Sequence, residues 1–162
     1  MNESEIREIV QKTISAVRSG KSGGKEVTLA NAERLCDAVI REAERMGVKA
    51  VVCVADAGGH PRIMKSMDGA YLASYDVAVN KAYTVVALKM STMTLKPLAQ
   101  PGASLYGIQF TNGGKIVIFG GGDPLRDERG EIVGGLGVSG GSEEEDAALS
   151  AYGRRFFENE MK

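Results

Sequence analysis

The sequence contains one histidine, His60, within the glycine-rich stretch of residues 56–70, which reads DAGGHPRIMKSMDGA. A single imidazole can supply an axial ligand to haem iron, so His60 is both the candidate metal ligand and a candidate cofactor-binding residue. One histidine cannot complete a zinc site with Cys36 and Cys53, because both cysteines lie in apolar patterns. The alternative is that His60 is a partly exposed turn residue next to Pro61.

A second candidate site consists of polar side chains that could bind a carboxylate. Lys81 falls on the expected inner face of a helix over residues 74–89, and a half-buried lysine needs either a partner or a ligand carboxylate. Haem propionates or a small hydroxy acid would suit such a lysine. The predicted polar pocket group is Lys81, Tyr83, Gln100 and Tyr106.

Gly120 and Gly121 are the third candidate, because glycine lets a bound molecule approach the backbone closely. They lack the spacing of a dinucleotide fingerprint, and no Gly-Lys-Ser/Thr loop follows them. The acidic residues 143–146 would also repel a phosphate at the start of the next helix. We therefore expect these glycines to bind a cofactor other than a nucleotide.

Composition narrows the class of protein. The 162 residues carry a formal net charge of −1, so there is no basic field to hold a nucleic-acid backbone. No apolar run approaches the roughly 18–20 residues that cross a bilayer, and residues 1–7 lack the pattern of a secretion signal. We expect a cytoplasmic protein with free cysteine thiols, no nucleic-acid partner and no membrane partner.

The chain divides into three predicted segments. Residues 1–18 form an amphipathic leader helix, because apolar residues recur at spacings of three and four. Residues 19–27 are small, polar and rich in glycine, which is typical of a flexible linker. Residues 28–162 form the main domain. A short amphipathic helix is not stable alone, so the leader must dock on the domain, on another subunit or on another protein.

The main domain is predicted to contain helices and an antiparallel sheet. Thr28 caps a helix that stops at Gly47, and Ser142 with Glu145 forms a capping box for the last helix. Residues 91–104 contain two prolines and read as a long loop. The order of elements favours an α+β fold with about five strands and helices packed against them. The expected strands cover residues 49–55, 62–66, 105–111 and 115–119, followed by hairpin arms at 125–126 and 131–138.

Several ordered motifs resemble the GlcG/HbpS family of haem-binding and accessory proteins, a family also found as the C-terminal domain of PduO. The resemblance runs from about residue 28 to residue 157. The motifs are the stretch 56–70 given above, NKAYT at 80–84, AQPGASLYG at 99–107, GGGDPL at 120–125 and IVGGLGVSGG at 132–141.

The resemblance implies a profilin-like or PAS-like three-layer sandwich and a homo-oligomer, from a tetramer to an octamer. It implies an accessory protein of diol-, glycolate- or cobalamin-associated catabolism that binds haem, a related tetrapyrrole or a small organic acid. Two alternatives stay open. One is a small enzyme that degrades haem or acts on a hydroxy acid, with Lys81 or Asp56 as its base. The other is a non-catalytic assembly module.

The leader resembles the encapsulation peptides of bacterial microcompartment cargo, which also combine an apolar helical stripe with a Gly/Ser-rich linker. The resemblance implies that residues 1–18 bind a shell or cargo protein and bring the chain into the microcompartment lumen. The alternative is an ordinary N-terminal helix that packs on its own domain or in an oligomer interface.

Overall fold

The computed structural model describes residues 2–19 and 25–161. Helix α1 (Glu3–Ser19) precedes residues 20–24, and the remaining elements follow them. In chain order these elements are α2 (Leu29–Met46), β1 (Val51–Asp56), β2 (Pro61–Ser66), α3 (Ser74–Ala87), α4 (Thr92–Leu98), the 3-10 turns η1 (Ile108–Phe110) and η2 (Asn112–Gly114), β3 (Gly122–Arg126), β4 (Ile132–Ser139) and α5 (Glu143–Glu160).

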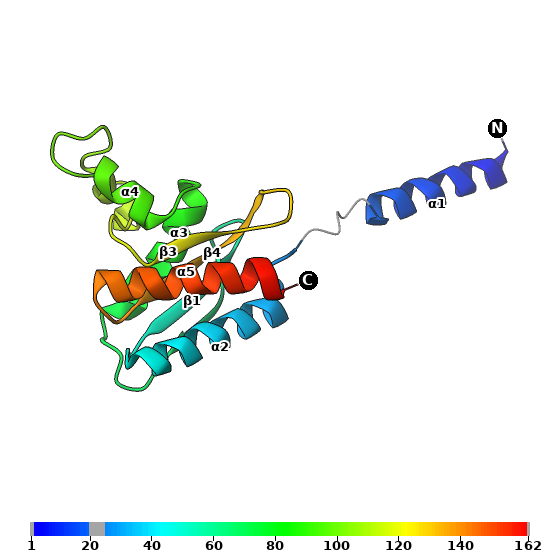
Figure 1. The fold of residues 1–162 in the computed structure, drawn as a ribbon. Helices are drawn as coiled ribbons and strands as arrows, with labels where there is room; N and C mark the ends of the chain where they lie inside the picture. Colours follow the sequence, from blue (N-terminus) through cyan, green and yellow to red (C-terminus); the bar gives the residue numbers. More distant parts are fainter. Residues whose placement is uncertain (1, 20–24, 162) are drawn as a thin grey trace.

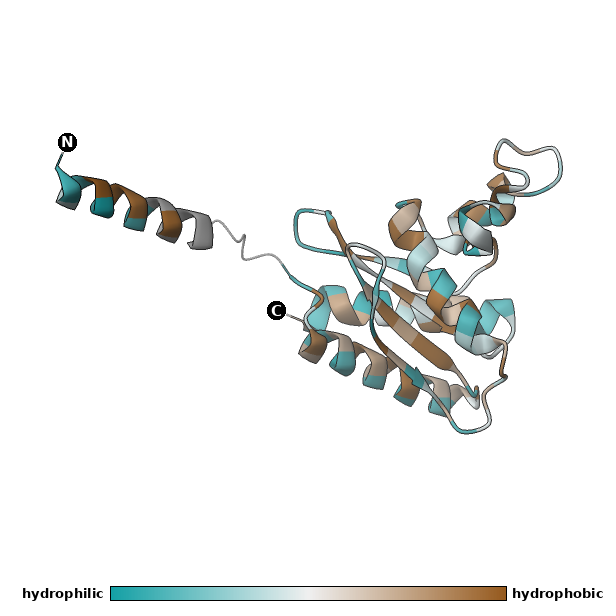
Figure 2. Cartoon of the chain, turned by 180° about the vertical axis from the view of Figure 1, so that it is seen from behind, coloured by the Kyte–Doolittle hydropathy of each residue, from teal (hydrophilic) through white to brown (hydrophobic). Residues whose placement is uncertain are grey.

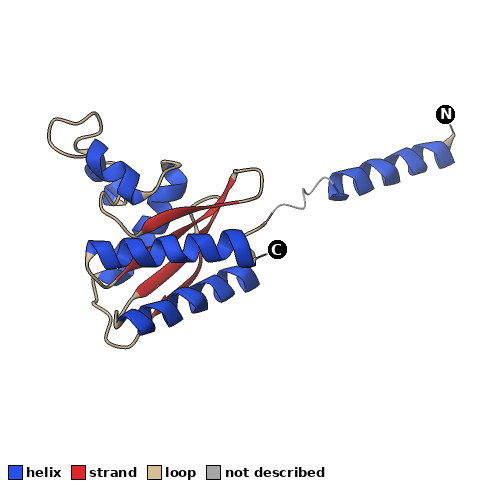
Figure 3. Ribbon diagram, viewed as in Figure 1, coloured by secondary structure: helices blue, strands red, loops and turns tan. Residues whose placement is uncertain are grey.

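The strands form one antiparallel sheet in the order β2–β1–β4–β3. Helices α2 and α5 lie on one face of the sheet and α3 lies on the other (Figures 1 and 3). This arrangement confirms the predicted α+β three-layer sandwich. The sheet has four strands, however, rather than about five.

The face beneath α2 and α5 contains the larger hydrophobic core. Val52 and Val54 of β1 point toward this face and lie in one cluster with Leu35 of α2 and Phe157 of α5. All four side chains are buried. Removal of this apolar surface from water is what fixes the two helices on the sheet.

The predicted helix caps are confirmed. The Thr28 hydroxyl accepts a hydrogen bond from the amide of Asn31, and Gly47 ends α2 in a left-handed conformation. Ser142 and Glu145 form the expected capping box at the start of α5. These caps satisfy backbone groups that would otherwise lack partners at the helix ends.

On the other face, α3 lies directly against the glycines of β4. A Cβ atom on Gly137 would overlap the carbonyl oxygen of Ala78, and one on Gly135 would overlap that of Ala82. The sequence 132–141 is rich in glycine because this helix backbone passes so close to the strand. These glycines therefore serve contact between layers.

Two predicted strands are wrong. Residues 105–111 form turns, including η1, and residues 115–119 are irregular. Asn112 and the two glycines after it have positive φ angles, which bends the chain between these segments. The amide of Val117 donates to Oγ1 of Thr84 in α3 at 3.0 Å, so it does not pair with a strand. Val117 is buried, which explains its strand-like apolar pattern.

The loop predicted at residues 91–104 also differs from the structure, because it contains α4. The hydroxyl of Ser91 caps this helix by accepting a hydrogen bond from the amide of Thr94. Pro97 lies in its last turn. The turns that follow, up to η2, form an excursion from the sandwich (Figure 1).

Helix α1 lies apart from the three layers in Figure 1, and Figure 2 shows hydrophobic and hydrophilic residues alternating along it. Ile6, Val10 and Ile14 are exposed. Of the predicted linker, residues 20–24 lie outside the described residues. Lys25 contacts the domain, because its ammonium donates to the carbonyl oxygen of Glu158. None of the helices in residues 2–19 and 25–161 is long and apolar enough to cross a membrane.

Candidate functional site

Lys81 of α3 is completely buried, and its side chain reaches from α3 to the first turn of α5. Its ammonium donates to the carbonyl oxygen of Val138 at 2.7 Å and to Oδ2 of Asp146 at 2.9 Å. The same ammonium lies 4.9 Å from the ring centroid of Phe119. We call these residues, together with Gly121, the Lys81 cluster.

The charges of the Lys81 cluster compensate one another. Burial lowers the pKa of Lys81, and the nearby carboxylate of Asp146 opposes that change. Burial raises the pKa of Asp146, and Lys81 opposes that change in turn. Since Asp146 already provides the partner that the lysine needs, a ligand carboxylate could reach Lys81 only by displacing it.

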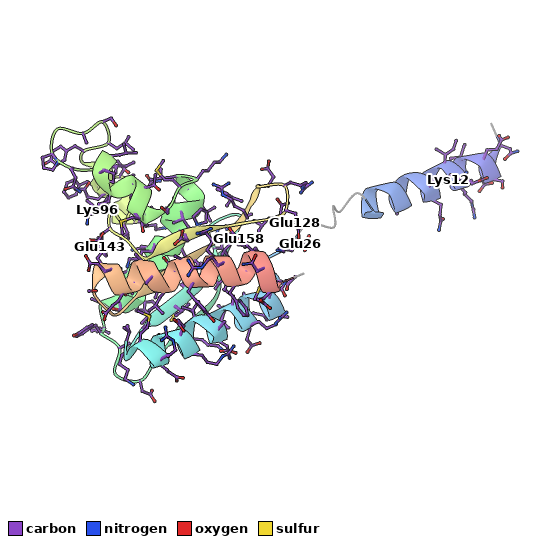
Figure 4. The ribbon with its side chains drawn as sticks, viewed as in Figure 1. Lys12, Glu26, Lys96, Glu128, Glu143 and Glu158 are labelled. Atoms are coloured by element: carbon purple, nitrogen blue, oxygen red, sulfur yellow. The ribbon has the colours of Figure 1, made fainter. Side chains whose placement is uncertain are left out.

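Gly120 and Gly121 are covered by the protein itself. Gly121 has a φ of 111°, and a Cβ atom on it would lie 2.6 Å from Nζ of Lys81. Gly121 therefore makes room for the lysine side chain. The amide of Gly120 donates to Oε1 of Glu143 at 2.9 Å, and Oε2 of Glu143 accepts from Nζ of Lys96 at 2.5 Å. Lys96 and Glu143 lie next to each other in Figure 4.

His60 lies in the turn between β1 and β2, and 83% of its side chain is exposed. Oδ1 of Asp56 accepts hydrogen bonds from the amides of Gly58 and His60, which shapes this turn. Nδ1 of His60 lies 3.6 Å from the same oxygen, and Arg62 Nε lies 3.4 Å from Oδ2 of Asp56. The imidazole therefore lies near a carboxylate while most of its ring faces solvent.

Tyr83 connects this turn to the excursion after α4. A Cβ atom on Gly59 would lie 3.1 Å from the Tyr83 ring, and the Tyr83 hydroxyl accepts a hydrogen bond from Nδ2 of Asn112 at 3.3 Å. The ammonium of Lys115 lies 5.5 Å from the centroid of the ring. We call Gly59, His60, Tyr83, Asn112 and Lys115 the Tyr83 cluster.

A hollow of about 410 Å³ adjoins the same turn. Asp56 and Arg62 form part of its wall, and the charged pair gives it a polar side. Burial tends to raise the pKa of Asp56, but hydrogen bonds from the amides of His60 and Gly58 outweigh it, so the pKa is lowered. The remaining residues that line the hollow are Glu26, Val27, Ala57, Gly58, Ile132 and Val133.

Residues 27–155 match the model of a family described as haem degrading protein HbpS-like. The chain belongs to the HbpS-like family. It is 44% identical over 124 residues to an uncharacterised 15.0 kDa protein of the dhaT-dhaS intergenic region of Citrobacter freundii, with 76% of this chain and 87% of the relative covered. The predicted relationship to GlcG/HbpS proteins is thereby confirmed.

Two further relatives carry the name PduO. The corrinoid adenosyltransferase PduO of Citrobacter freundii is 38% identical over 147 residues, which cover 90% of this chain but only 44% of PduO. A crystal structure of a PduOC:haem complex superposes with a TM-score of 0.77 at 37% identity, covering 81% of this chain and 94% of the other. The chain therefore spans less than half of full-length PduO.

In this HbpS-like chain, the predicted polar group does not form one pocket. Lys81 is buried in its own cluster, whereas Tyr83 lies in the cluster near His60. Gln100 is exposed and donates to the carbonyl oxygen of Lys96 at 2.9 Å. Tyr106 is 62% exposed in the excursion. A binding role for these residues remains a prediction.

The sequence reasoning missed Asp146 and Asn112 as partners in these clusters. In the sequence, Asp146 is one of several acidic residues at the start of a helix. Its burial results from the packing of α5 on the sheet, which the sequence does not show. Asn112 gave a turn signal, which the structure confirms, without indicating that it reaches Tyr83. Among the described residues, no group of three or more His, Cys, Asp or Glu side chains could hold a metal ion.

Residues 137–141 read GVSGG, which has the Gly-x-Ser-x-Gly spacing of a nucleophile turn. Ser139 is buried, and its hydroxyl donates to Oγ of Ser74 at 3.1 Å. It pairs with Val51 at the start of β1, whereas His60 follows the other end of that strand. A strand of this length separates them by more than about 15 Å, so the histidine cannot activate this serine.

Proposed function

We propose that this protein binds haem or a related tetrapyrrole as an accessory protein, with His60 as an axial ligand. The observation that carries the proposal is the exposed imidazole of His60 in a domain similar to one crystallised with haem. A carboxylate that accepts a hydrogen bond from an imidazole orients the ring for metal ligation. Oδ1 of Asp56 lies 3.6 Å from Nδ1 of His60, so a small rotation of the ring would form this bond.

The residues around His60 fit such a group better than the Lys81 cluster does. Haem iron would supply the coordination chemistry, and one imidazole is sufficient to hold it on one side. The cations Arg62 and Lys115 lie in or beside the same region and could pair with propionates. Lys81, Gly120 and Gly121, in contrast, are enclosed by protein atoms.

A haem titration of the full chain, followed by absorption spectroscopy, tests the proposal. We expect a shifted Soret band for the wild type and loss of that shift in His60→Ala. Gln100→Ala and Tyr106→Ala are matched exposed substitutions, and they also decide whether these two predicted residues contribute. A wild type that leaves the haem spectrum unchanged would overturn haem binding. A His60→Ala variant with the wild-type spectrum would overturn the ligand assignment.

The description of the family favours a second candidate, a haem-degrading enzyme. The titrated sample distinguishes the two, because degradation in the presence of a reductant and oxygen would bleach the Soret band with time. Asp56 is a poor candidate for a base near neutral pH, since its lowered pKa keeps it ionised and weakly basic. A small organic acid as ligand has less support, because Lys81 is already paired.

We also propose that residues 1–18 direct the protein to a microcompartment of a diol- or glycolate-type pathway. The proposal rests on the resemblance of the leader and on its exposed apolar side chains, among them Ile6, Val10 and Ile14. Residues 1–25 fused to a fluorescent protein should form foci in cells that contain such compartments. Ile6→Lys should disperse them, and Gln11→Lys on the polar face should not. Diffuse fluorescence of the unaltered fusion would contradict the proposal.

A further inference from the structure

The sheet has two outer edges, which are formed by strands β2 and β3. The edge of a strand can present unpaired backbone amides and carbonyls, and these form a template for another strand. In an antiparallel ladder, alternate residues bond to the neighbouring strand, and the backbone groups of the residues between them point away from it. The register of each ladder therefore shows which residues of β2 and β3 face outward.

The β3 edge is closed by the protein itself. The amide of Val138 donates to the carbonyl oxygen of Gly121 at 2.8 Å, so the backbone groups of Gly122 and Pro124 face outward. The amide of Gly122 donates to Oγ1 of Thr92 in α4 at 2.9 Å. Pro124 has no amide hydrogen. Neither residue offers a donor to another strand.

The β2 edge is open. The amide of Met67 donates to the carbonyl oxygen of Ala50 at 3.0 Å, one position beyond the pair of Val51 and Ser66. The backbone groups of Ser66 and Met64 therefore face away from β1. Among the described residues, no hydrogen bond from outside the ladder reaches the backbone of either one. The helices that contact β2 are α2 and α3, which cover the two faces of the sheet and leave its edge free.

The side chains of β2 indicate which kind of strand fits this edge. Ile63 packs on the core beneath α2 and α5, and Met64 packs on the core of the other face. The side chain of Arg62 is 50% exposed, and Lys65 lies beside Asp37 of α2. Strand β2 contains no acidic residue. An acidic strand would therefore add opposite charges at this edge, whereas a second copy of β2 would add two more cations.

We propose that β2 binds an extended acidic segment of another protein, which pairs with the backbone of Met64 and Ser66 as an added outer strand. In this mode of recognition, main-chain hydrogen bonds give affinity and alternate side chains give specificity. The segment has acidic residues opposite Arg62 and Lys65. Apolar residues lie between them, opposite Ile63 and Met64. The proposal does not depend on haem binding or on the leader.

Amide hydrogen exchange of the full chain, followed by NMR, tests whether the β2 edge is open. The amides of Met64 and Ser66 should exchange at least about tenfold faster than those of Ile63 and Lys65, which face β1. Slow exchange at Met64 and Ser66 in the protein alone would show that the edge is already covered, for example by a second copy. That result would overturn the proposal.

A synthetic peptide tests the kind of partner. The sequence Ser-Thr-Glu-Val-Val-Glu-Thr-Ser reads the same in both directions, so it can match β2 in a parallel or an antiparallel orientation. Labelled with a fluorophore, it should bind in an anisotropy titration and slow the exchange of the Met64 and Ser66 amides. Lysines in place of its glutamates should raise the dissociation constant by about tenfold. N-methylation of both valines should abolish binding, because it removes a backbone donor that faces β2.

The same peptides define the results that would overturn the proposal. These are no binding of the glutamate peptide, or equal affinity of either the lysine or the N-methylated peptide.

A protein variant tests the assigned charges. Arg62→Gln combined with Lys65→Gln removes both cations and should weaken binding of the glutamate peptide by about tenfold. Arg34→Gln, which removes a cation from an exposed position of α2, should leave the affinity unchanged. Circular dichroism shows whether both variants are folded. A folded double variant with wild-type affinity would overturn the pairing of acidic residues with Arg62 and Lys65.

Discussion

Lys81 and Tyr83 are two residues apart on the same helix, yet they belong to clusters of opposite character. The Lys81 cluster is closed, because its ammonium is buried and bonded to Asp146 and Val138. The Tyr83 cluster is open, because Tyr83 is half-buried and His60 is largely exposed. Helical geometry causes the difference, since residues two apart point in directions about 200° apart.

The comparison shows how a chemically active residue can serve structure alone. A lysine within a family-like motif suggests a ligand, but the charge of a buried lysine paired with a buried carboxylate is already compensated. An exposed histidine adds little to stability and remains available to bind. Accessibility, more than residue type, therefore separates the structural site from the candidate binding site.

The largest effect is expected from Lys81→Met. The substitution leaves Asp146 buried without its counter-charge, which should lower the free energy of unfolding by about 3–5 kcal/mol. Urea unfolding measures the loss. His60→Ala is the matched change in the open cluster, and it should alter stability by less than about 0.5 kcal/mol.

A second substitution sharpens the Lys81→Met experiment. Lys81→Met combined with Asp146→Leu removes both charges and should recover much of the lost stability. If Lys81→Met lowers the free energy of unfolding by less than about 1 kcal/mol, Lys81 and Asp146 do not form a buried ion pair. Unchanged haem affinity in a folded Lys81→Met variant would exclude Lys81 as a ligand to propionates.

The next effect concerns the contact between α3 and β4. Gly137→Ala inserts a methyl group where the carbonyl oxygen of Ala78 lies, so unfolding should become easier by about 1–3 kcal/mol. Thermal unfolding measures this. Gly58→Ala is the control beside the Tyr83 cluster, because its methyl group meets the movable side chain of His60. Equal losses in the two variants would contradict the close backbone contact at Gly137.

The smallest effect is expected at the edge of the closed cluster. Hydrogen bonds from Lys96 and from the amide of Gly120 lower the pKa of Glu143 below its ordinary 4.5. As the pH falls, the unfolded chain binds this proton first, so the stabilisation is present above about pH 4.5 and is lost below it. Glu143→Gln should reduce the fall in the free energy of unfolding at acidic pH. At neutral pH it should lower that free energy by less than about 1 kcal/mol.

Urea unfolding between pH 3 and pH 7 measures the effect of Glu143→Gln. Glu144→Gln is the control, because it removes the same charge from an exposed position of the same helical turn. A pH dependence that Glu143→Gln leaves unaltered would show that the contact with Lys96 does not persist in solution.

Local signals predicted much of the fold. The caps at Thr28 and Ser142, the hairpin of β3 and β4, and the helix α3 all follow from residues within a few positions of one another. Residues 115–119 were wrongly predicted to form a strand, because burial produces the same apolar pattern in an irregular segment as in a strand. The amide of Val117 donates to the hydroxyl of Thr84 in α3, a contact that no short window of sequence reveals.

The site was harder to predict than the fold, for a physical reason. The need of Lys81 for a partner was evident, but Asp146 lies 65 positions further along the chain. The dense glycines indicated close approach of the backbone. What approaches Gly121 and Gly137 is the protein itself, through Lys81 and Ala78, and the sequence carries no signal that separates this from a ligand.

The anchoring of Lys25 has a practical consequence. Its contacts with Glu158 and Glu128 place the start of the domain beside the end of α5 and the β3–β4 turn (Figure 4). Glu26 and Val27 then border the hollow at Asp56. The start of the domain thus lies next to the β1–β2 turn. A reporter protein fused directly before Lys25, in place of the leader, would therefore lie close to His60 and is a poor choice for binding assays.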